Sequence, residues 1–258
     1  MSLRTNILIV IKAVSYVAKR LIFFSMENKS FDKYAEKYDA WFLENLNVLY
    51  SEVKLVAHFL KDAGRILSVG CGSGLFEMIL MKEFGITIKD GIEPSVDMAG
   101  IARQRGLSVE IGTAEDICVE EGKFDTILYN GCPSYISNLK KAVTNSYNAL
   151  PEGGRIVLID VPKESSYGLL YNLAKATGTW NHELLKDVYP RNPYPIELVC
   201  QSNWRTTAEK IVLLENAGFS NLEFAQTLTK HPIYSNNVIE EPVEGYDCGD
   251  YVAICGYK

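Results

Sequence analysis

The sequence predicts an α/β fold, with a doubly wound and mostly parallel sheet covered by helices on both faces. Short apolar runs typical of buried strands alternate along most of the chain with segments of helical periodicity. The first run, 66–69, leads through a glycine-rich turn into a helical segment at 75–82. Because this strand–turn–helix order recurs, we expect a sheet of seven strands in one large domain.

The expected elements follow the chain in order, and an aromatic helix precedes the first strand. We expect helices at 31–42, 48–61, 75–82, 96–105, 138–150 and 206–218, and strands at 66–69, 86–93, 107–111, 124–131, 155–160, 219–225 and 251–257.

Length and composition limit the domain organisation and the partners. A chain of 258 residues with 47% apolar residues is long enough for one domain with an insertion, which we assign to 30–258 after an extension at 1–29. The net charge of −6 argues against a nucleic-acid partner. The six cysteines form no C-x-x-C pair, so we expect reduced thiols and a cytoplasmic protein. A homodimer is compatible with the sequence.

The N-terminal extension contains an apolar run at 7–11, but charged residues interrupt the stretch from 3 to 24. A membrane-spanning helix needs about 20 mostly apolar residues, and Lys12 lies in the middle of this segment. No small-residue cleavage site precedes Met26. We therefore expect a peripheral helix, or an extension ahead of a start at Met26, rather than a membrane anchor.

Glycines at 70, 72 and 74 connect the first strand to its helix. Glycine permits positive φ and lets a ligand approach the backbone, and the helix N-terminus offers unpaired N–H groups. A dinucleotide-binding loop would need a third glycine where Leu75 or Glu77 stands, and a P-loop would need a closing Lys and Ser or Thr. A G-x-G-x-G loop after a strand remains.

Glu93 ends the expected second strand, about twenty residues after the glycines. A doubly wound sheet presents a carboxylate at this position to the two hydroxyls of a ribose, and a carboxylate can accept both hydrogen bonds. The alternative is a surface acid that caps the helix beginning near Ser95. The spacing favours the ribose role.

Together these motifs resemble the class I S-adenosylmethionine-dependent methyltransferases, including the group that acts in quinone biosynthesis. The resemblance runs from about Ser30 to Lys258 and includes a G-x-A-E turn at 112–115, an L-x-x-G-G run at 150–154 and an A-G-F turn at 217–219. It implies a Rossmann-like fold with an antiparallel last strand, S-adenosylmethionine as cofactor, and methyl transfer to a small-molecule acceptor. A quinone- or lipid-type C-methyltransferase and a non-catalytic cofactor-binding protein are the alternatives.

The resemblance also implies which residues bind the cofactor. They are Tyr38, Trp41, Gly70, Cys71, Gly72, Ser73, Gly74, Glu93, Pro94, Ser95, Thr113, Ala114, Glu115, Asn130 and Gly131. The aromatic residues of the helix at 31–42 have an alternative role as a core-facing stripe.

No catalytic triad is visible, and none is needed, because a sulfonium methyl group reacts once a nucleophile is aligned with it. If the acceptor must lose a proton, Tyr135, Asp160 and His182 are candidate bases in no fixed order, and each has a structural alternative. We expect no metal, since the fourth strand ends in Asn130 and the fifth strand offers only Asp160.

The βα rhythm stops between 163 and 203, where tyrosines, tryptophans and prolines are frequent. A long insertion after the fifth strand lies above the expected ligand site, so it can serve as a substrate lid. Aromatic residues also pack accessory helices. The sequence leaves both interpretations open.

Overall fold

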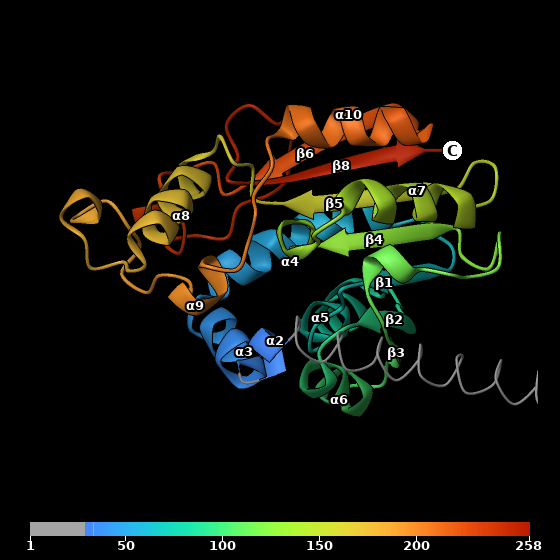
Figure 1. Cartoon of the computed structure of the whole chain (residues 1–258), viewed down its shortest axis with the longest axis horizontal. Coiled ribbons are helices and arrows are strands. Elements are labelled where there is room, and N and C mark those ends of the chain that lie inside the picture. The colour runs from blue at the N-terminus through green and yellow to red at the C-terminus, as the bar shows by residue number, and fades with distance from the viewer. Residues whose placement is uncertain (1–28, 33) are drawn as a thin grey trace, which may run out of the picture.

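The computed structural model describes residues 29–32 and 34–258 (Figure 1). The extension expected at 1–29 lies outside the described residues, except for Lys29. In the described part of the chain, no helix is long and apolar enough to cross a membrane.

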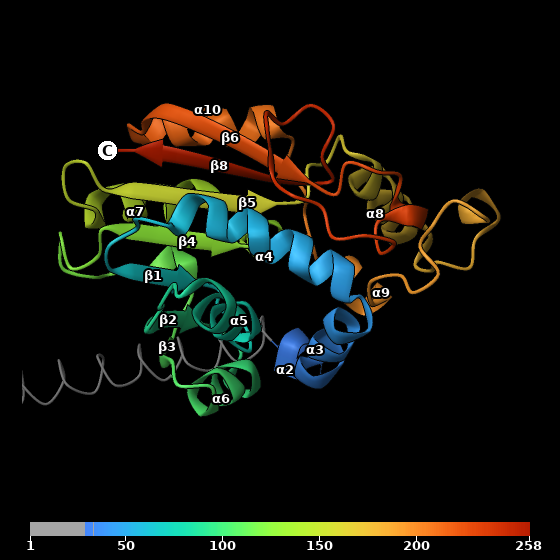
Figure 2. The ribbon, with the colours of Figure 1, turned by 180° about the vertical axis from the view of Figure 1, so that it is seen from behind.

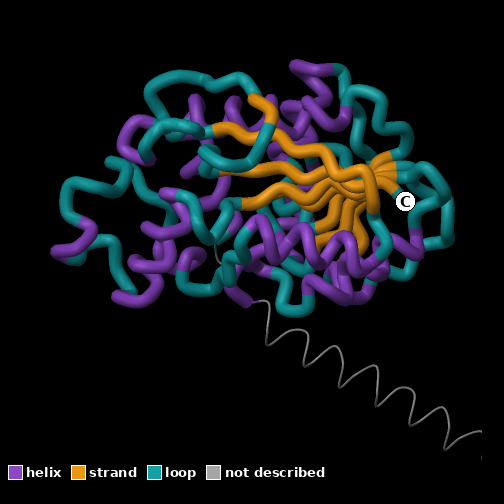
Figure 3. Tube along the Cα trace, turned by 90° about the horizontal axis from the view of Figure 1, so that it is seen from above, coloured by secondary structure: helices purple, strands orange, loops and turns teal. Residues whose placement is uncertain are grey.

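A single mixed sheet forms the centre of the molecule (Figures 1 and 3). Its spatial order is β3-β2-β1-β4-β5-β8-β6-β7, in which β1 to β5 pair in parallel, and the pairs of β8 with β5 and β6 and of β7 with β6 are antiparallel. The strands are β1 (Ile66–Val69), β2 (Asp90–Glu93), β3 (Ser108–Ile111), β4 (Thr126–Asn130), β5 (Arg155–Asp160), β6 (Ser220–Thr227), β7 (Val243–Glu244) and β8 (Tyr251–Tyr257).

The predicted doubly wound, mostly parallel sheet is confirmed, but among the described residues it has eight strands rather than seven. The extra strand, β7, has two residues that pair with Ala225 and Gln226 at the edge of the sheet. A two-residue strand is too short to produce a periodic signal in the sequence. The expected strand at 86–93 is shorter in the structure, since Ile86 and Ile88 are buried in the core without pairing.

Helices cover both faces of the sheet (Figures 1 and 2). The apolar side chains of α4 and α5 pack into one core cluster, and those of α7 and α10 pack into another on the opposite face. The expected aromatic helix is divided into α2 and α3. The helices are α2 (Lys29–Asp32), α3 (Ala35–Glu44), α4 (Leu46–Leu60), α5 (Leu75–Phe84), α6 (Val96–Gln104), α7 (Leu139–Ala149), α8 (Ser166–Thr177), α9 (Ile196–Val199) and α10 (Thr207–Ala217).

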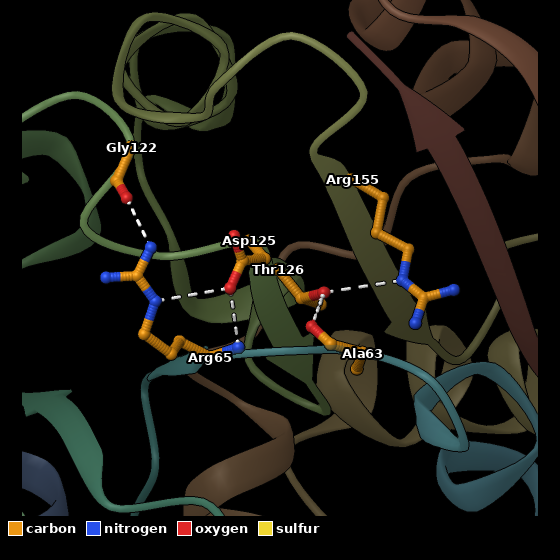
Figure 4. Close-up of polar contacts among 6 residues, drawn as sticks. All are labelled: Ala63, Arg65, Gly122, Asp125, Thr126 and Arg155. Atoms are coloured by element: carbon orange, nitrogen blue, oxygen red, sulfur yellow. Dashed lines mark hydrogen bonds and ion pairs between the residues drawn. The ribbon is translucent and has the colours of Figure 1, made fainter.

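The amino ends of the parallel strands are closed by polar contacts (Figure 4). The Arg65 backbone N–H and the Arg65 Nε donate to Asp125 Oδ2 at 2.8 and 3.3 Å, and the Thr126 hydroxyl donates to the Ala63 carbonyl at 2.6 Å. These contacts join the residues before β1 to the start of β4. Ligands of such sheets usually bind at the opposite, carboxyl ends of the strands.

The segment expected as an insertion, 163–203, contains α8, α9 and connecting loops beyond the carboxyl ends of β4 and β5 (Figures 1 and 2). Its aromatic residues Tyr171, Trp180 and Tyr194 are buried in the same core cluster as α4. The accessory-packing interpretation therefore applies to most of these side chains.

Candidate active site

A cavity of about 700 Å³ opens at the carboxyl ends of β1, β2 and β4. Most of the expected site residues contribute to its wall. The lining residues are Phe31, Tyr38, Val69, Gly70, Gly72, Glu93, Pro94, Met98, Thr113, Ala114, Glu115, Asp116, Asn130, Gly131, Cys132, Tyr135, Ile136, Ser137, Asn138, Lys141, Gln201 and Asn203.

The glycine loop supplies backbone rather than side chains to this wall. Gly70 and Gly72 have φ values of 65° and 56°, a region that side-chain-bearing residues rarely adopt. A Cβ atom on Gly70 would lie 2.7 Å from the Cys132 Cβ, whereas one on Gly72 would meet no protein atom within 4 Å. Gly70 is thus required by packing, and Gly72 keeps the cavity wall open to a ligand.

Glu93 is buried at the end of β2 and is held by two backbone groups. The N–H groups of Gly72 and Ser95 each donate to a different oxygen of its carboxylate at 2.9 Å. Since each carboxylate oxygen has two lone pairs, both retain an acceptor site for a ligand hydroxyl. Burial raises the pKa of Glu93 to about 7, although the two backbone hydrogen bonds act in the opposite direction.

The turn after β3 forms the neighbouring part of the wall through Thr113 and the short 3₁₀ helix Ala114–Asp116. The Glu115 Oε1 accepts a hydrogen bond from the Asn138 backbone N–H at 3.0 Å, next to the start of α7. Glu115 therefore joins this turn to α7, and Glu115 and Asp116 line the cavity together with Thr113 and Ala114.

Five expected cofactor residues lie outside the cavity lining, namely Trp41, Cys71, Ser73, Gly74 and Ser95. Trp41 donates from Nε1 to the Asn192 carbonyl at 3.1 Å, and the Ser95 hydroxyl accepts from the Met98 N–H at 3.2 Å as the N-cap of α6. The other three lie within the glycine loop, where Cys71 is buried. These five residues therefore support the cavity wall from behind and do not face a ligand in the cavity.

Arg105, which sequence reasoning missed, connects the glycine loop to α3. Its guanidinium donates to Asp39 Oδ2 at 2.7 Å, and to the carbonyl and hydroxyl oxygens of Ser73 at 2.9 and 2.7 Å. The Ser73 hydroxyl in turn donates to Asp39 Oδ1 at 2.5 Å. Asp39, Ser73 and Arg105 are far apart along the chain, so the sequence shows two isolated charged residues and does not indicate that they meet.

Of the three candidate bases, Tyr135 is the one that lines the cavity. Its hydroxyl donates to the Tyr194 hydroxyl at 3.4 Å, and burial raises its pKa. Asp160 is buried at the end of β5, where burial raises its pKa to about 6 against the effect of nearby Lys210. His182 accepts from the Leu184 N–H at 3.2 Å within 163–203, and neither it nor Asp160 lines the cavity.

The remaining wall of the cavity is aromatic and comes from distant segments. The Phe31 ring lies edge-on to Tyr135 with ring centroids 5.0 Å apart, and Tyr38 lies 6.3 Å from Phe31 by the same measure. Gln201 and Asn203, from the end of the expected insertion, also line the cavity, as the sequence had not indicated. One cavity thus joins the glycine loop to an aromatic wall.

Comparison with known proteins agrees with this geometry. The model of a methyltransferase domain family matches residues 29–223. A solved structure from Thermotoga maritima, described as an S-adenosylmethionine-dependent methyltransferase and possible histamine N-methyltransferase, is 30% identical with a TM-score of 0.75, over 89% of this chain and 98% of that one. The fold is that of a class I S-adenosylmethionine-dependent methyltransferase.

Two relatives differ in how much of this chain their sequences match. An uncharacterized protein of Methanocaldococcus jannaschii is 32% identical over 228 residues, which cover 88% of this chain and 98% of the relative. A malonyl-[acyl-carrier protein] O-methyltransferase of Priestia megaterium is 23% identical over 50% of this chain and 48% of that protein. The chain belongs to the methyltransferase domain family, and its cofactor is S-adenosylmethionine.

Proposed function

We propose that this enzyme transfers the methyl group of S-adenosylmethionine, in line, to a small-molecule acceptor bound in the same cavity. The observation that carries the proposal is the continuity of the cavity from the glycine loop and Glu93 to the aromatic residues Phe31, Tyr38 and Tyr135. Its volume of about 700 Å³ is in the range of small-molecule sites.

At the cofactor end, the residues that line the cavity support a binding mode for S-adenosylmethionine. We assign the ribose hydroxyls to Glu93, the adenine to the turn at Thr113–Asp116, and the amino-acid portion to the backbone of Gly70 and Gly72. When bound, the cofactor supplies a methyl group on a sulfonium, which an acceptor atom attacks as the S–CH₃ bond breaks. Asn130 and Gly131 line the cavity at the end of β4, next to the aromatic wall.

At the acceptor end, the aromatic wall excludes water and aligns the acceptor. Desolvation and alignment account for much of the rate of such a displacement. Tyr135 is a poor base at neutral pH because burial raises its pKa, so we assign its ring to acceptor packing. Asp160 and His182 lie outside the cavity wall, and we assign neither a direct role.

The segment 163–203 is proposed to cover the acceptor end, since Gln201 and Asn203 line the cavity. Most of its aromatic side chains are buried in the core, so any movement on ligand binding would be limited to the residues nearest the cavity. Protection of residues 196–203 from amide exchange by S-adenosylhomocysteine is the expected result. Unchanged exchange there would favour a purely structural segment.

Among the alternatives, an apolar quinone or lipid fits the aromatic wall less well than a polar small molecule does. Gln201, Asn203 and Asn130 add amide groups to the same cavity. We also propose a cytoplasmic location, since all six cysteines are free in a fold that needs no disulfides.

Calorimetric titration with S-adenosylhomocysteine tests the cofactor end, with NADH as the control. Binding of S-adenosylhomocysteine without binding of NADH is expected. Binding of neither ligand would favour a non-catalytic protein. The acceptor end is tested by measuring S-adenosylhomocysteine release from S-adenosylmethionine in the presence of a library of small molecules, and turnover with a polymer alone would contradict the proposal.

A further inference from the structure

A short turn after β4 contributes Tyr135 to the aromatic wall of the cavity. The turn is the 3₁₀ helix Pro133–Tyr135, and its neighbours Cys132 and Ile136 line the cavity as well. Within it, the Tyr135 N–H donates to the Cys132 carbonyl at 2.9 Å, and the Ile136 N–H donates to the Pro133 carbonyl at 3.3 Å. A single 3₁₀ turn is not stable by itself, so the position of the Tyr135 ring depends on contacts from other segments.

Arg205 supplies such contacts. Its Nη1 donates to the Pro133 carbonyl and its Nη2 to the Ile136 carbonyl, both at 2.9 Å. These two acceptors lie on either side of Tyr135, so one planar guanidinium fixes the backbone before and after this residue. Arg205 makes no ion pair in the part of the chain that the structure describes. Its donors are directed to backbone carbonyls, and a charged donor makes a hydrogen bond about twice as strong as a neutral one does.

The same turn is joined to the end of the segment 163–203. The Asn203 N–H donates to the Ser134 carbonyl at 2.6 Å, and the Asn203 carbonyl accepts a longer contact from Arg205 Nη1 at 3.4 Å. Asn203 lines the cavity, as Tyr135 does. The turn after β4 and the end of the segment therefore form one continuous piece of the wall, and Arg205 lies behind it.

The backbone of Arg205 is itself anchored. Its carbonyl accepts from the Lys163 N–H at 3.1 Å, at the start of the segment 163–203. The next residue, Thr206, is the N-cap of α10 and forms a capping box with Glu209. The apolar side chains of α10 pack into the core. The guanidinium thus extends from a fixed helix start to a turn that few other bonds hold.

We propose that Arg205 is a positioning residue for methyl transfer, which holds the wall formed by Tyr135 and Asn203 in the place that aligns the acceptor. The inference rests on the proposed function of the same cavity. Arg205 does not line the cavity, so it acts through those two residues and not by contact with a ligand. In a reaction that depends on alignment, a shift of about 1 Å can lower the rate about a hundredfold. Loss of Arg205 should therefore impair the acceptor end and leave the cofactor end, around Gly70 and Glu93, unchanged.

A purely structural role is the alternative for Arg205. In that case its loss lowers the stability of the whole fold, and the molecules that remain folded keep their kinetic constants. Arg205→Lys separates the two roles because it keeps the positive charge and most of the apolar stem. The lysine ammonium lacks the planar fork that spans two carbonyls, so only the geometry of the contact is removed.

Amide exchange of the full chain, saturated with S-adenosylhomocysteine, measures the turn directly. We expect the amides of Tyr135, Ile136 and Asn203 to exchange at least about tenfold faster in Arg205→Lys and in Arg205→Met, because charged hydrogen bonds to the turn are lost. The amides of β5 should exchange as in the wild-type chain. The control is Arg191→Met, which removes an exposed arginine between α8 and α9 and should change neither.

The kinetic test uses an acceptor found in the S-adenosylhomocysteine release assay. In Arg205→Lys, kcat/KM for the acceptor should fall at least about tenfold, because the wall no longer aligns the acceptor. The KM for S-adenosylmethionine and the affinity for S-adenosylhomocysteine should stay within about twofold of the wild-type values. Arg191→Met should match the wild-type chain in all of these constants.

Unchanged exchange at the turn, equal acceleration in β5, or an unchanged kcat/KM for the acceptor would each overturn the inference and leave the proposed function standing. The wild-type chain provides a test that needs no variant. If its amides at Tyr135, Ile136 and Asn203 exchange as fast as those of an unstructured peptide, Arg205 holds no fixed turn and the inference is wrong. Failure of the wild-type chain to bind S-adenosylhomocysteine, or to methylate any small molecule, would overturn both proposals.

Discussion

The proposed cofactor end of the cavity, around Gly70, Gly72 and Glu93, is built largely from backbone groups of one stretch of chain. The proposed acceptor end is a wall of side chains that come from distant segments. Gly70, Gly72 and Glu93 lie within 24 residues of one another, and their hydrogen bonds are short and satisfied. Phe31, Tyr135 and Asn203 come from three separate parts of the chain and meet in one wall.

The difference has a physical origin. A ligand common to a whole family can be held by groups that every sequence has, namely backbone N–H and C=O groups fixed by turns. An acceptor that differs between relatives must be selected by side chains, which can change without disturbing the sheet. We therefore expect changes at the cofactor end to alter affinity for the cofactor, and changes at the acceptor end to alter turnover or acceptor choice.

Glu93→Ala should have the largest effect on the cofactor end. The substitution removes a charged acceptor for the ribose and leaves the N–H groups of Gly72 and Ser95 without a partner, so S-adenosylhomocysteine affinity should fall by about a hundredfold, in line with about 1.5–3 kcal/mol for a charged hydrogen bond. Calorimetry measures the change. Glu110→Ala, on the exposed side of β3, is the control, and equal affinities in the two variants would remove the ribose assignment.

Breaking the contact of α3 with the glycine loop should lower stability. Arg105→Met leaves the buried Asp39 without its guanidinium partner, and we expect the free energy of unfolding to fall by about 3 kcal/mol. Urea denaturation of Arg105→Met and of Arg191→Met, which removes an exposed arginine outside the helices, measures the difference. An equal decrease in the free energy of unfolding in both variants would show that the contact of Arg105 with Asp39 does not stabilise the fold.

Cofactor binding should depend on pH through Glu93. Its pKa of about 7 in the folded chain means that the carboxyl is mostly protonated at pH 6 and mostly ionised at pH 8. Ribose hydroxyls donate to the ionised form, so S-adenosylhomocysteine affinity should rise about tenfold from pH 6 to pH 8. Titrations in this range check the slope, and a slope of the same size in Glu93→Gln would assign the proton to another group.

Tyr135→Phe should have the smallest effect. If the ring packs the acceptor and its hydroxyl is not a base, S-adenosylhomocysteine affinity should stay unchanged and turnover should fall less than about threefold, because the hydroxyl makes only a 3.4 Å contact with Tyr194. Steady-state kinetics with an acceptor found in the release assay provide the measurement. A loss of a hundredfold or more in turnover at constant affinity would make Tyr135 the general base.

The doubly wound sheet was predictable because the strand and helix periodicities are local. The run at 155–160 is a strand in the structure with these bounds, because a short continuous apolar run is typical of a strand that is buried on both faces, and every residue after Arg155 is buried. β7 was missed because two paired residues leave no pattern, and the expected helix at 31–42 is divided between α2 and α3.

The sequence by itself determined the family and the cofactor, and it predicted the residues of the proposed cofactor end, because a glycine loop, an acid at fixed spacing and a short turn are close together along the chain. The tertiary structure alone decided which aromatic residues face the cavity and which are core. Trp41 and Tyr38 lie three residues apart on α3, yet Trp41 is buried against Tyr194 while Tyr38 lines the cavity.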